Sequence, residues 1–284
     1  MAVFYNRATL SYNDSSTNSN IVTGEIREAV TAVKTAVTDT YENGDDVTYV
    51  ISLVNSGSTS LNGLTVTDNL GAYTFNGNTL YPLTYIQNSL KYYVNGVLQA
   101  SPTISSTSPL IITGISIPAN GNTVLVYEAA VNSYAPIGPN GSITNTGSVT
   151  GDDLITPIPF TETIQAIQGV NLSITKSLSP EVIVNNGEIT YTFTILNTGS
   201  EAATATDNLV ITDLFNPILD ITSVVYNGTA WTSPDNYTYN ETTGLFQTVA
   251  GRITVPGATF TQDPTTGIWN TVPGSATLTV TGTI

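Results

Sequence analysis

The chain has 284 residues, enough for about two domains, and 40% of them are hydrophobic, so each domain can bury a core. A net charge of −15 is unfavourable for binding nucleic acids or anionic membranes, because both attract basic surfaces. Neither Cys nor His occurs, which excludes disulfides, thiolate nucleophiles, imidazole bases and ordinary zinc sites. We therefore expect no cofactor, no metal and no nucleic-acid partner, and no membrane insertion because no run of about 18 apolar residues is present.

The sequence predicts β-strands along almost its whole length and no helix. Hydrophobic and polar residues alternate over 47–53, 190–195 and 277–281, and turns rich in Gly, Asn and Pro separate such segments. The stretch from Glu25 to Val37 is rich in Val and Thr, so we expect a strand there too. The predicted fold is all-β, with two Ig-like β-sandwiches in tandem.

An internal repeat connects the two predicted domains. Lys34 precedes Tyr49 by fifteen residues and Lys176 precedes Tyr191 by the same number, so the copies lie at an offset of 142 residues. Further matches follow in the same order along both copies. They are 54–57 with 196–199, 64–68 with 209–213 and 124–131 with 277–284.

The first copy continues through residues 142–153, whereas the second copy reaches Ile284 without a counterpart. Residues 3–14 resemble that counterpart, because they match 142–153 at an offset of 139 and place Asn6 on Asn145. We therefore predict that the second sandwich lacks its last strand and that the N-terminus carries it. The predicted order is a donor strand (1–14), a linker (15–24), the first sandwich (25–153), a second linker (154–169) and the strand-incomplete second sandwich (170–284).

A sandwich without its last strand exposes an unpaired edge and part of its apolar core. The N-terminal strand of another copy could fill that position by strand addition, and this contact would propagate head to tail. Alternatively, residues 1–14 fold back onto the second domain of the same chain or pair elsewhere. The donor face that would enter the groove carries Phe4, Asn6, Ala8, Leu10 and Tyr12.

Three polar residues of the first domain stand where period-two alternation places core residues, namely Lys34, Asp68 and Asn145. Burial favours a neutral amine beside a protonated acid, so the amine can attack the Asn carboxamide. Asp68 would act as the catalytic residue that polarises the carbonyl and transfers the proton to the departing ammonia. We predict an isopeptide crosslink between Lys34 and Asn145. A buried ion pair with a hydrogen-bonded Asn is the alternative, and Glu128 is an alternative acid.

The second domain repeats two of these residues, Lys176 and Asp213, in the same alternation. The third, Asn6, lies on the N-terminal strand, so we predict that Lys176 and Asn6 of different copies form a crosslink with Asp213 as the catalytic residue.

These motifs resemble the prokaryotic surface-protein repeat family called domain of unknown function 11, and they are similar to isopeptide-forming domains of the collagen-adhesin type. The resemblance covers nearly the whole chain and implies an Ig-like fold found in surface stalks and adhesins. The sequence departs from the family by splitting the second motif set between its two ends. The residues that carry the resemblance are Lys34, Tyr49, Asn55, Gly57, Asp68 and Asn145, then Lys176, Tyr191, Asn197, Gly199 and Asp213, with Asn6 from the N-terminus.

We expect a structural subunit of a self-assembling extracellular fibre at a cell or spore surface, with other copies of itself as partners. It is not expected to be an enzyme, because each crosslink forms only once. The alternative is a monomeric stalk or adhesin module that binds a glycan or protein ligand through aromatic loops, and a hydrolase using only carboxylates ranks third. The candidate aromatic residues are Tyr226, Trp231, Tyr237, Tyr239 and Trp269.

Overall fold

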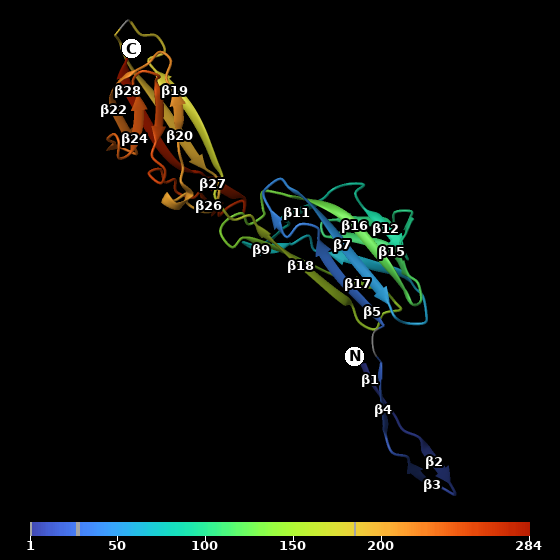
Figure 1. Cartoon of the computed structure of the whole chain (residues 1–284). Coiled ribbons are helices and arrows are strands. Elements are labelled where there is room, and N and C mark those ends of the chain that lie inside the picture. The colour runs from blue at the N-terminus through green and yellow to red at the C-terminus, as the bar shows by residue number, and fades with distance from the viewer. Residues whose placement is uncertain (1, 27–28, 185) are drawn as a thin grey trace. The chain divides into compact units, whose positions relative to one another are not determined.

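The structure is a computed structural model that describes residues 2–26, 29–184 and 186–284 (Figure 1). The described residues form strands throughout, with one short 3-10 helix, η1 (Ala205–Asp207), and no α-helix. None of their helices has the length and apolar character that crossing a bilayer requires. The chain divides into two compact units, the first made of residues 1–136 and 141–165 and the second of 137–140 and 166–284. The predicted all-β fold of Ig-like sandwiches is confirmed.

Apart from the N-terminal segment 2–26, the first unit is built on two antiparallel sheets packed face to face. One sheet has the strand order β13-β12-β16-β7-β5, with β11 also paired to β16, and the other has the order β14-β15-β8-β17-β18-β6. A small hairpin, β9-β10, lies outside both sheets. The strands are β5 (Val30–Ala36), β6 (Thr40–Tyr41), β7 (Asp46–Asn55), β8 (Leu61–Asp68), β9 (Tyr73–Phe75), β10 (Asn78–Leu80), β11 (Leu83–Tyr85), β12 (Lys91–Val94), β13 (Val97–Gln99), β14 (Thr103–Thr107), β15 (Leu110–Ile117), β16 (Gly121–Val131), β17 (Ser142–Thr150) and β18 (Ile158–Ala166).

Period-two alternation directs one face of each central strand into the core. On β7 the buried residues are Val47, Tyr49, Ile51 and Leu53, separated by more exposed residues. Burying such a side chain contributes roughly 1.5–3 kcal/mol relative to leaving it in water. A polar residue that falls on this face is therefore buried by the strand that carries it.

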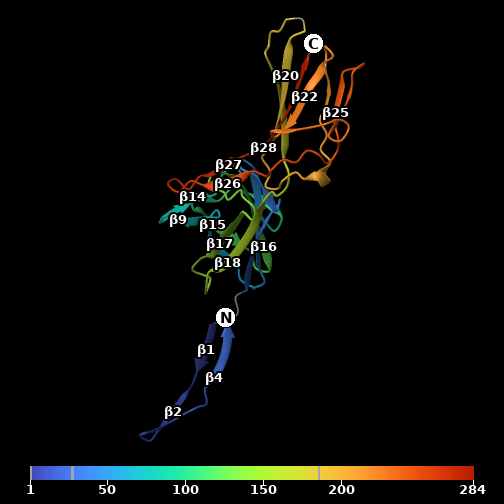
Figure 2. The same cartoon turned by 90° about the vertical axis from the view of Figure 1, so that its left-hand side faces the viewer.

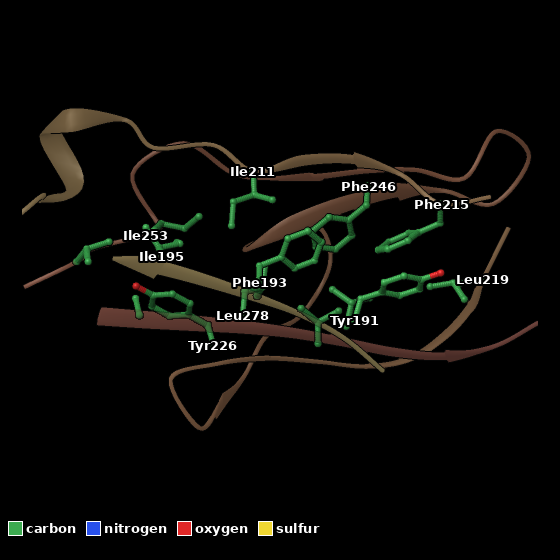
Figure 3. Close-up of a cluster of buried hydrophobic side chains, with 14 of the residues drawn as sticks. Tyr191, Phe193, Ile195, Ile211, Phe215, Leu219, Tyr226, Phe246, Ile253 and Leu278 are labelled. Carbon is green, nitrogen blue, oxygen red and sulfur yellow. The ribbon is translucent and has the colours of Figure 1, made fainter. Parts of the chain in front are cut away.

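The second unit repeats most of this arrangement around an aromatic core (Figure 3). Its five-stranded sheet, β19-β20-β28-β22-β23, corresponds to β5-β7-β16-β12-β13, and its three-stranded sheet, β24-β25-β21, corresponds to β14-β15-β8. Among its described residues no strand takes the positions of β17, β18 and β6. The strands are β19 (Leu172–Ser179), β20 (Glu188–Asn197), β21 (Thr212–Leu214), β22 (Asp220–Tyr226), β23 (Thr229–Ala230), β24 (Tyr237–Asn240), β25 (Leu245–Thr248), β28 (Gly274–Thr283) and the separate hairpin β26 (Thr259–Gln262) and β27 (Trp269–Val272).

The N-terminal segment differs from the predicted single strand and linker. It is a two-stranded antiparallel ribbon, in which β1 (Ala2–Asn6) pairs with β4 (Val22–Ile26) and β2 (Thr9–Tyr12) pairs with β3 (Ser15–Asn18) (Figures 1 and 2). Asn13 and Asp14 both have positive φ angles, 43° and 61°, as a two-residue hairpin turn requires. Residues 15–24 are thus mainly strand. Residue 1 of the predicted donor strand and residues 27–28 of the strand predicted over 25–37 lie outside the described residues.

The segment 154–169 also differs from the predicted linker. Residues 158–166 form β18, which pairs with β17 from Val149↔Ile158 to Ser142↔Gln165. Ile158, Phe160, Ile164 and Ala166 are buried, because period-two alternation places them on the core face of this strand.

Candidate functional site

The first unit brings Lys34, Asp68 and Asn145 into one buried cluster. Lys34 lies on β5 in one sheet, whereas Asp68 ends β8 and Asn145 lies on β17 in the other sheet. Lys34 Nζ is 2.5 Å from Asp68 Oδ2, and both side chains are fully buried. Period-two alternation along the strands therefore buries all three residues in the core, as the sequence predicted.

Sequence reasoning missed the fourth member of this cluster, Tyr127 on β16. Its hydroxyl donates to Asp68 Oδ2 at 2.7 Å and accepts from Asn145 Nδ2 at 3.3 Å. Glu128, the alternative acid, is exposed, because its neighbour Tyr127 occupies the core face of the strand. Tyr127 thus links the carboxylate to the carboxamide, and the only signal for it was a tyrosine at a core position.

Burial changes the chemistry of this cluster. It lowers the pKa of Lys34 from 10.5 to about 8, although the Asp68 carboxylate opposes that shift. Burial likewise raises the pKa of Tyr127 well above its ordinary value, so its hydroxyl keeps the proton. With a pKa of about 8, roughly a tenth of the Lys34 amine is neutral at pH 7. The cluster therefore holds a usable nucleophile.

Two buried oxygens of the cluster, Asn145 Oδ1 and the Tyr49 hydroxyl, make no hydrogen bond of good geometry among the described residues, although the Asn145 side chain lies close enough to Tyr49 to oppose the rise in the Tyr49 pKa that burial causes. Leaving such a group unpaired costs about 1–3 kcal/mol. The Tyr49 ring also lies 4.4 Å from Lys34 Nζ and excludes water from the amine. The carboxamide is thus held without its full set of hydrogen bonds beside a buried amine.

The second unit repeats the Lys–Asp pair but leaves it accessible. Lys176 on β19 donates to Asp213 on β21, and their side chains are 39% and 18% exposed. The centroid of the Tyr191 ring lies 4.4 Å from Lys176 Nζ, and the centroid of the Tyr49 ring lies at the same distance from Lys34 Nζ. In the register of the first sheet Tyr127 lies opposite Tyr49. In the second sheet Val280 lies opposite Tyr191, so the position of Tyr127 is held by a side chain without a hydroxyl.

An open groove of about 340 Å³ lies over this pair, and half of its lining residues are apolar. In the first unit β17 lies beside β8 with Gly147 opposite Asp68, whereas the corresponding edge of β21 is unpaired among the described strands. The groove therefore occupies the place that β17 fills in the first unit. Its lining residues are Ile174, Thr175, Lys176, Phe193, Val210, Ile211, Thr212 and Asp213.

The predicted donor residues lie on the N-terminal ribbon. Asn6 is on β1 opposite Val22, and Phe4, Leu10 and Tyr12 are each more than half exposed. Ala8 lies between β1 and β2 and is exposed as well. Lys176 donates to Asp213 in the second unit, whereas Asn6 lies on β1 in the first unit, so the Lys176–Asn6 pair stays a prediction.

The aromatic residues considered for ligand binding mainly serve the second core. Tyr226 packs against Trp231 with ring centroids 4.7 Å apart, and Tyr237 stacks on Phe246 at 5.2 Å. The Tyr239 hydroxyl donates to Leu219 O at 2.8 Å. Most of these rings therefore pack against the core of the second unit. No group of three acidic side chains that could hold a metal ion was found among the described residues.

The sequence matches no family model and no curated protein. Among solved structures, BcpA, the major pilin subunit of Bacillus cereus, is 12% identical over 96% of this chain and 73% of that chain, with a TM-score of 0.35. The N-terminal domain of the Streptococcus gordonii adhesin Sgo0707 is 16% identical over 54% of this chain and 36% of that chain, with a TM-score of 0.37. A family 123 glycoside hydrolase from Clostridium perfringens is 13% identical over 49% of this chain and 27% of that chain, with a TM-score of 0.32.

This chain thus spans about a quarter of the hydrolase and about a third of the streptococcal adhesin. Likeness at this level carries no argument about function. The resemblance to domain of unknown function 11 stays a sequence-based prediction.

Proposed function

We propose that the chain is a structural subunit of an extracellular fibre, in which the N-terminal strand of one copy completes the second unit of the next. One observation carries this proposal. The groove over Lys176 and Asp213 has the position of β17, and residues 3–14 have the sequence pattern of β17.

Packing supports this assembly. In the first unit β17 pairs with β8 and buries Ile143 and Val149 in the core. At the offset of 139 residues the donor places Phe4 and Leu10 at these positions, both of which are exposed in the single chain. Their burial would contribute roughly 1.5–3 kcal/mol each. Because donor and groove are different surfaces, the contact is heterologous and extends head to tail into a filament.

The proposed bond between copies uses the same chemistry as the one proposed within the first unit. Lys176 Nζ attacks Cγ of Asn6 from the neighbouring copy, so that an Nζ–Cγ bond forms and the Cγ–Nδ2 bond breaks. Asp213 accepts a proton from the amine and passes it to Nδ2, which leaves as ammonia. Each Lys and Asn reacts once, so the protein is a crosslinked structural protein rather than an enzyme, and it needs no cofactor.

The test is a denaturing gel of the purified chain after boiling in detergent. The wild type is expected to give a ladder of covalent oligomers, whereas Asn6→Ala and Lys176→Ala are expected to give monomer only. Asn270→Ala changes an exposed Asn of β27 and is the matched control that should keep the ladder. A ladder that survives both Asn6→Ala and Lys176→Ala would refute the bond, and a wild type that forms neither ladder nor filaments by electron microscopy would refute the fibre.

A further inference from the structure

We infer that the donor is the entire N-terminal ribbon, residues 2–26, rather than a single strand. In this arrangement the ribbon adds two strands to the second unit of the neighbouring copy. There β1 and β2 correspond to β17 of the first unit, and β3 and β4 correspond to β18. The inference rests on the proposed function and specifies which part of the chain enters the groove.

The space to be filled is two strands wide. In the first unit β17 and β18 together lie between β8 and β6, with strands about 4.8 Å apart in a sheet. The backbone N–H of Gln165 on β18 donates to Asp39 O, next to β6, at 2.8 Å. At the repeat offset of 142 residues, Asp39, Thr40 and Tyr41 correspond to residues 181–183 of the second unit.

Residues 181–183 form no strand, and two apolar side chains of the segment 181–184 are exposed to solvent. Val182 is 87% exposed and Val184 is 79% exposed, whereas Ile183 packs against the second core as the counterpart of Tyr41. A single donor strand would pair with β21 and leave both its own outer edge and the 181–184 segment unpaired. A two-stranded donor satisfies both edges.

The ribbon has the pairing that this position requires. In the first unit Asn145 of β17 lies opposite Glu162 of β18, and in the ribbon Asn6 of β1 lies opposite Val22 of β4. Directly opposed residues share one face of a sheet, so Val22 lies on the same face as Asn6. That face is the one which, in the first unit, turns Asn145 toward the core.

The core-facing sides of the ribbon and of the β17–β18 pair each carry an aromatic ring over a glycine, at different positions along the strands. The Phe4 ring covers Gly24 so closely that a Cβ there would lie 2.3 Å from the ring. In the first unit the Phe160 ring covers Gly147 in the same way, with 2.4 Å from a Cβ to the ring. The two contacts are alike in kind, but the offset of 139 residues places Phe4 at Ile143, which pairs with Ile164 rather than with Phe160.

The inference is tested with two lysine variants at adjacent positions of β4. Val22→Lys places a charge on the face that would meet Lys176, and Thr23→Lys places it on the opposite face, where the corresponding Thr163 is exposed. We expect Thr23→Lys to give the wild-type ladder and Val22→Lys to reduce covalent oligomers at least tenfold. Circular dichroism checks that the two units remain folded in both variants.

Equal ladders from Val22→Lys and the wild type would overturn the ribbon inference and leave the proposed fibre intact, since the wild type would still polymerise. Equal loss in both variants would also overturn it, because the effect would not depend on the face. Hydrogen exchange on wild-type filaments provides a second measurement. Backbone amides of 22–24 and 181–184 should be protected as strongly as those of β18, and rapid exchange there would refute the ribbon.

Discussion

The lowered pKa of Lys34 predicts how the stability of the first unit depends on pH when the crosslink cannot form. In Asn145→Ala the Lys34 amine remains free, with a pKa of about 8 when folded against 10.5 for an unperturbed Lys. Between these values the unfolded chain binds more protons than the folded chain, so stability increases with pH. From pH 8 to pH 9 the expected gain in the free energy of unfolding is about 1 kcal/mol, because Lys34 in the folded chain is already half deprotonated at pH 8 and each full pKa unit contributes about 1.4 kcal/mol.

The wild type should lack this dependence if the amine has become an amide, because nothing then titrates at Lys34. Lys34→Met in the Asn145→Ala background is the control, and it should also be insensitive to pH over this range. Tyr41, Tyr49 and Tyr127 also have raised pKa values because they are buried, and ionisation of these residues in the unfolded chain lowers stability above about pH 9, so the window from pH 8 to pH 9 isolates the lysine.

Urea unfolding followed by circular dichroism measures the free energy. Both Trp residues of the chain, Trp231 and Trp269, lie in the second unit, so their fluorescence reports its transition separately. A flat profile in Asn145→Ala would refute the reasoning on the Lys34 pKa. A wild type that gains stability as Asn145→Ala does would show that the amine persists and would refute the crosslink.

Two further predictions concern the same cluster. Monomer of the Lys176→Ala variant should have an intact mass one ammonia lower than its sequence requires, and Lys34→Met added to it should restore the full mass; an unshifted mass would exclude the Lys34–Asn145 bond. Tyr127→Phe removes a hydrogen bond to the buried Asp68 carboxylate, at a cost of about 1–3 kcal/mol, and should slow ammonia loss in the first unit roughly tenfold or more. It should leave oligomer formation unchanged, because Val280 stands at that position in the second unit, and equal slowing of both reactions would contradict this assignment.

The sequence was sufficient for the first cluster because a charged residue on an apolar face is conspicuous. Lys34 and Asp68 break the alternation of their strands, and the repeat shows the same break at Lys176 and Asp213. Tyr127 could not be found in this way, because a tyrosine at a core position looks like an ordinary packing residue. The role of Tyr127 depends on which face of β16 turns inward and on which residues lie near its hydroxyl. Both depend on the register of the sheets, which the sequence does not show.

The two elements that were predicted as linkers show where alternation fails as a signal. β18 does alternate, but Pro157 and Pro159 at its start resemble a loop. β3 is built from Ser, Thr and Asn, all exposed, so neither face of this strand carries a hydrophobic pattern. The pairing of β3 with β2 follows from the Asn13–Asp14 turn, and it is a property of the hairpin rather than of either strand alone.

The difference between the two Lys–Asp pairs suggests how crosslinking between copies is coupled to assembly. The first pair is fully buried because β17 and β18 cover it, whereas solvent reaches Lys176 across an open groove. Attack by a lysine side chain is favoured when water is excluded from it, and excluding water from Lys176 requires a donor over the pair. Under the proposed function the segment that excludes the water also carries Asn6. The reaction at Lys176 would therefore begin only when the electrophile is in place, which couples permanent linkage to correct docking and leaves the free subunit unreacted.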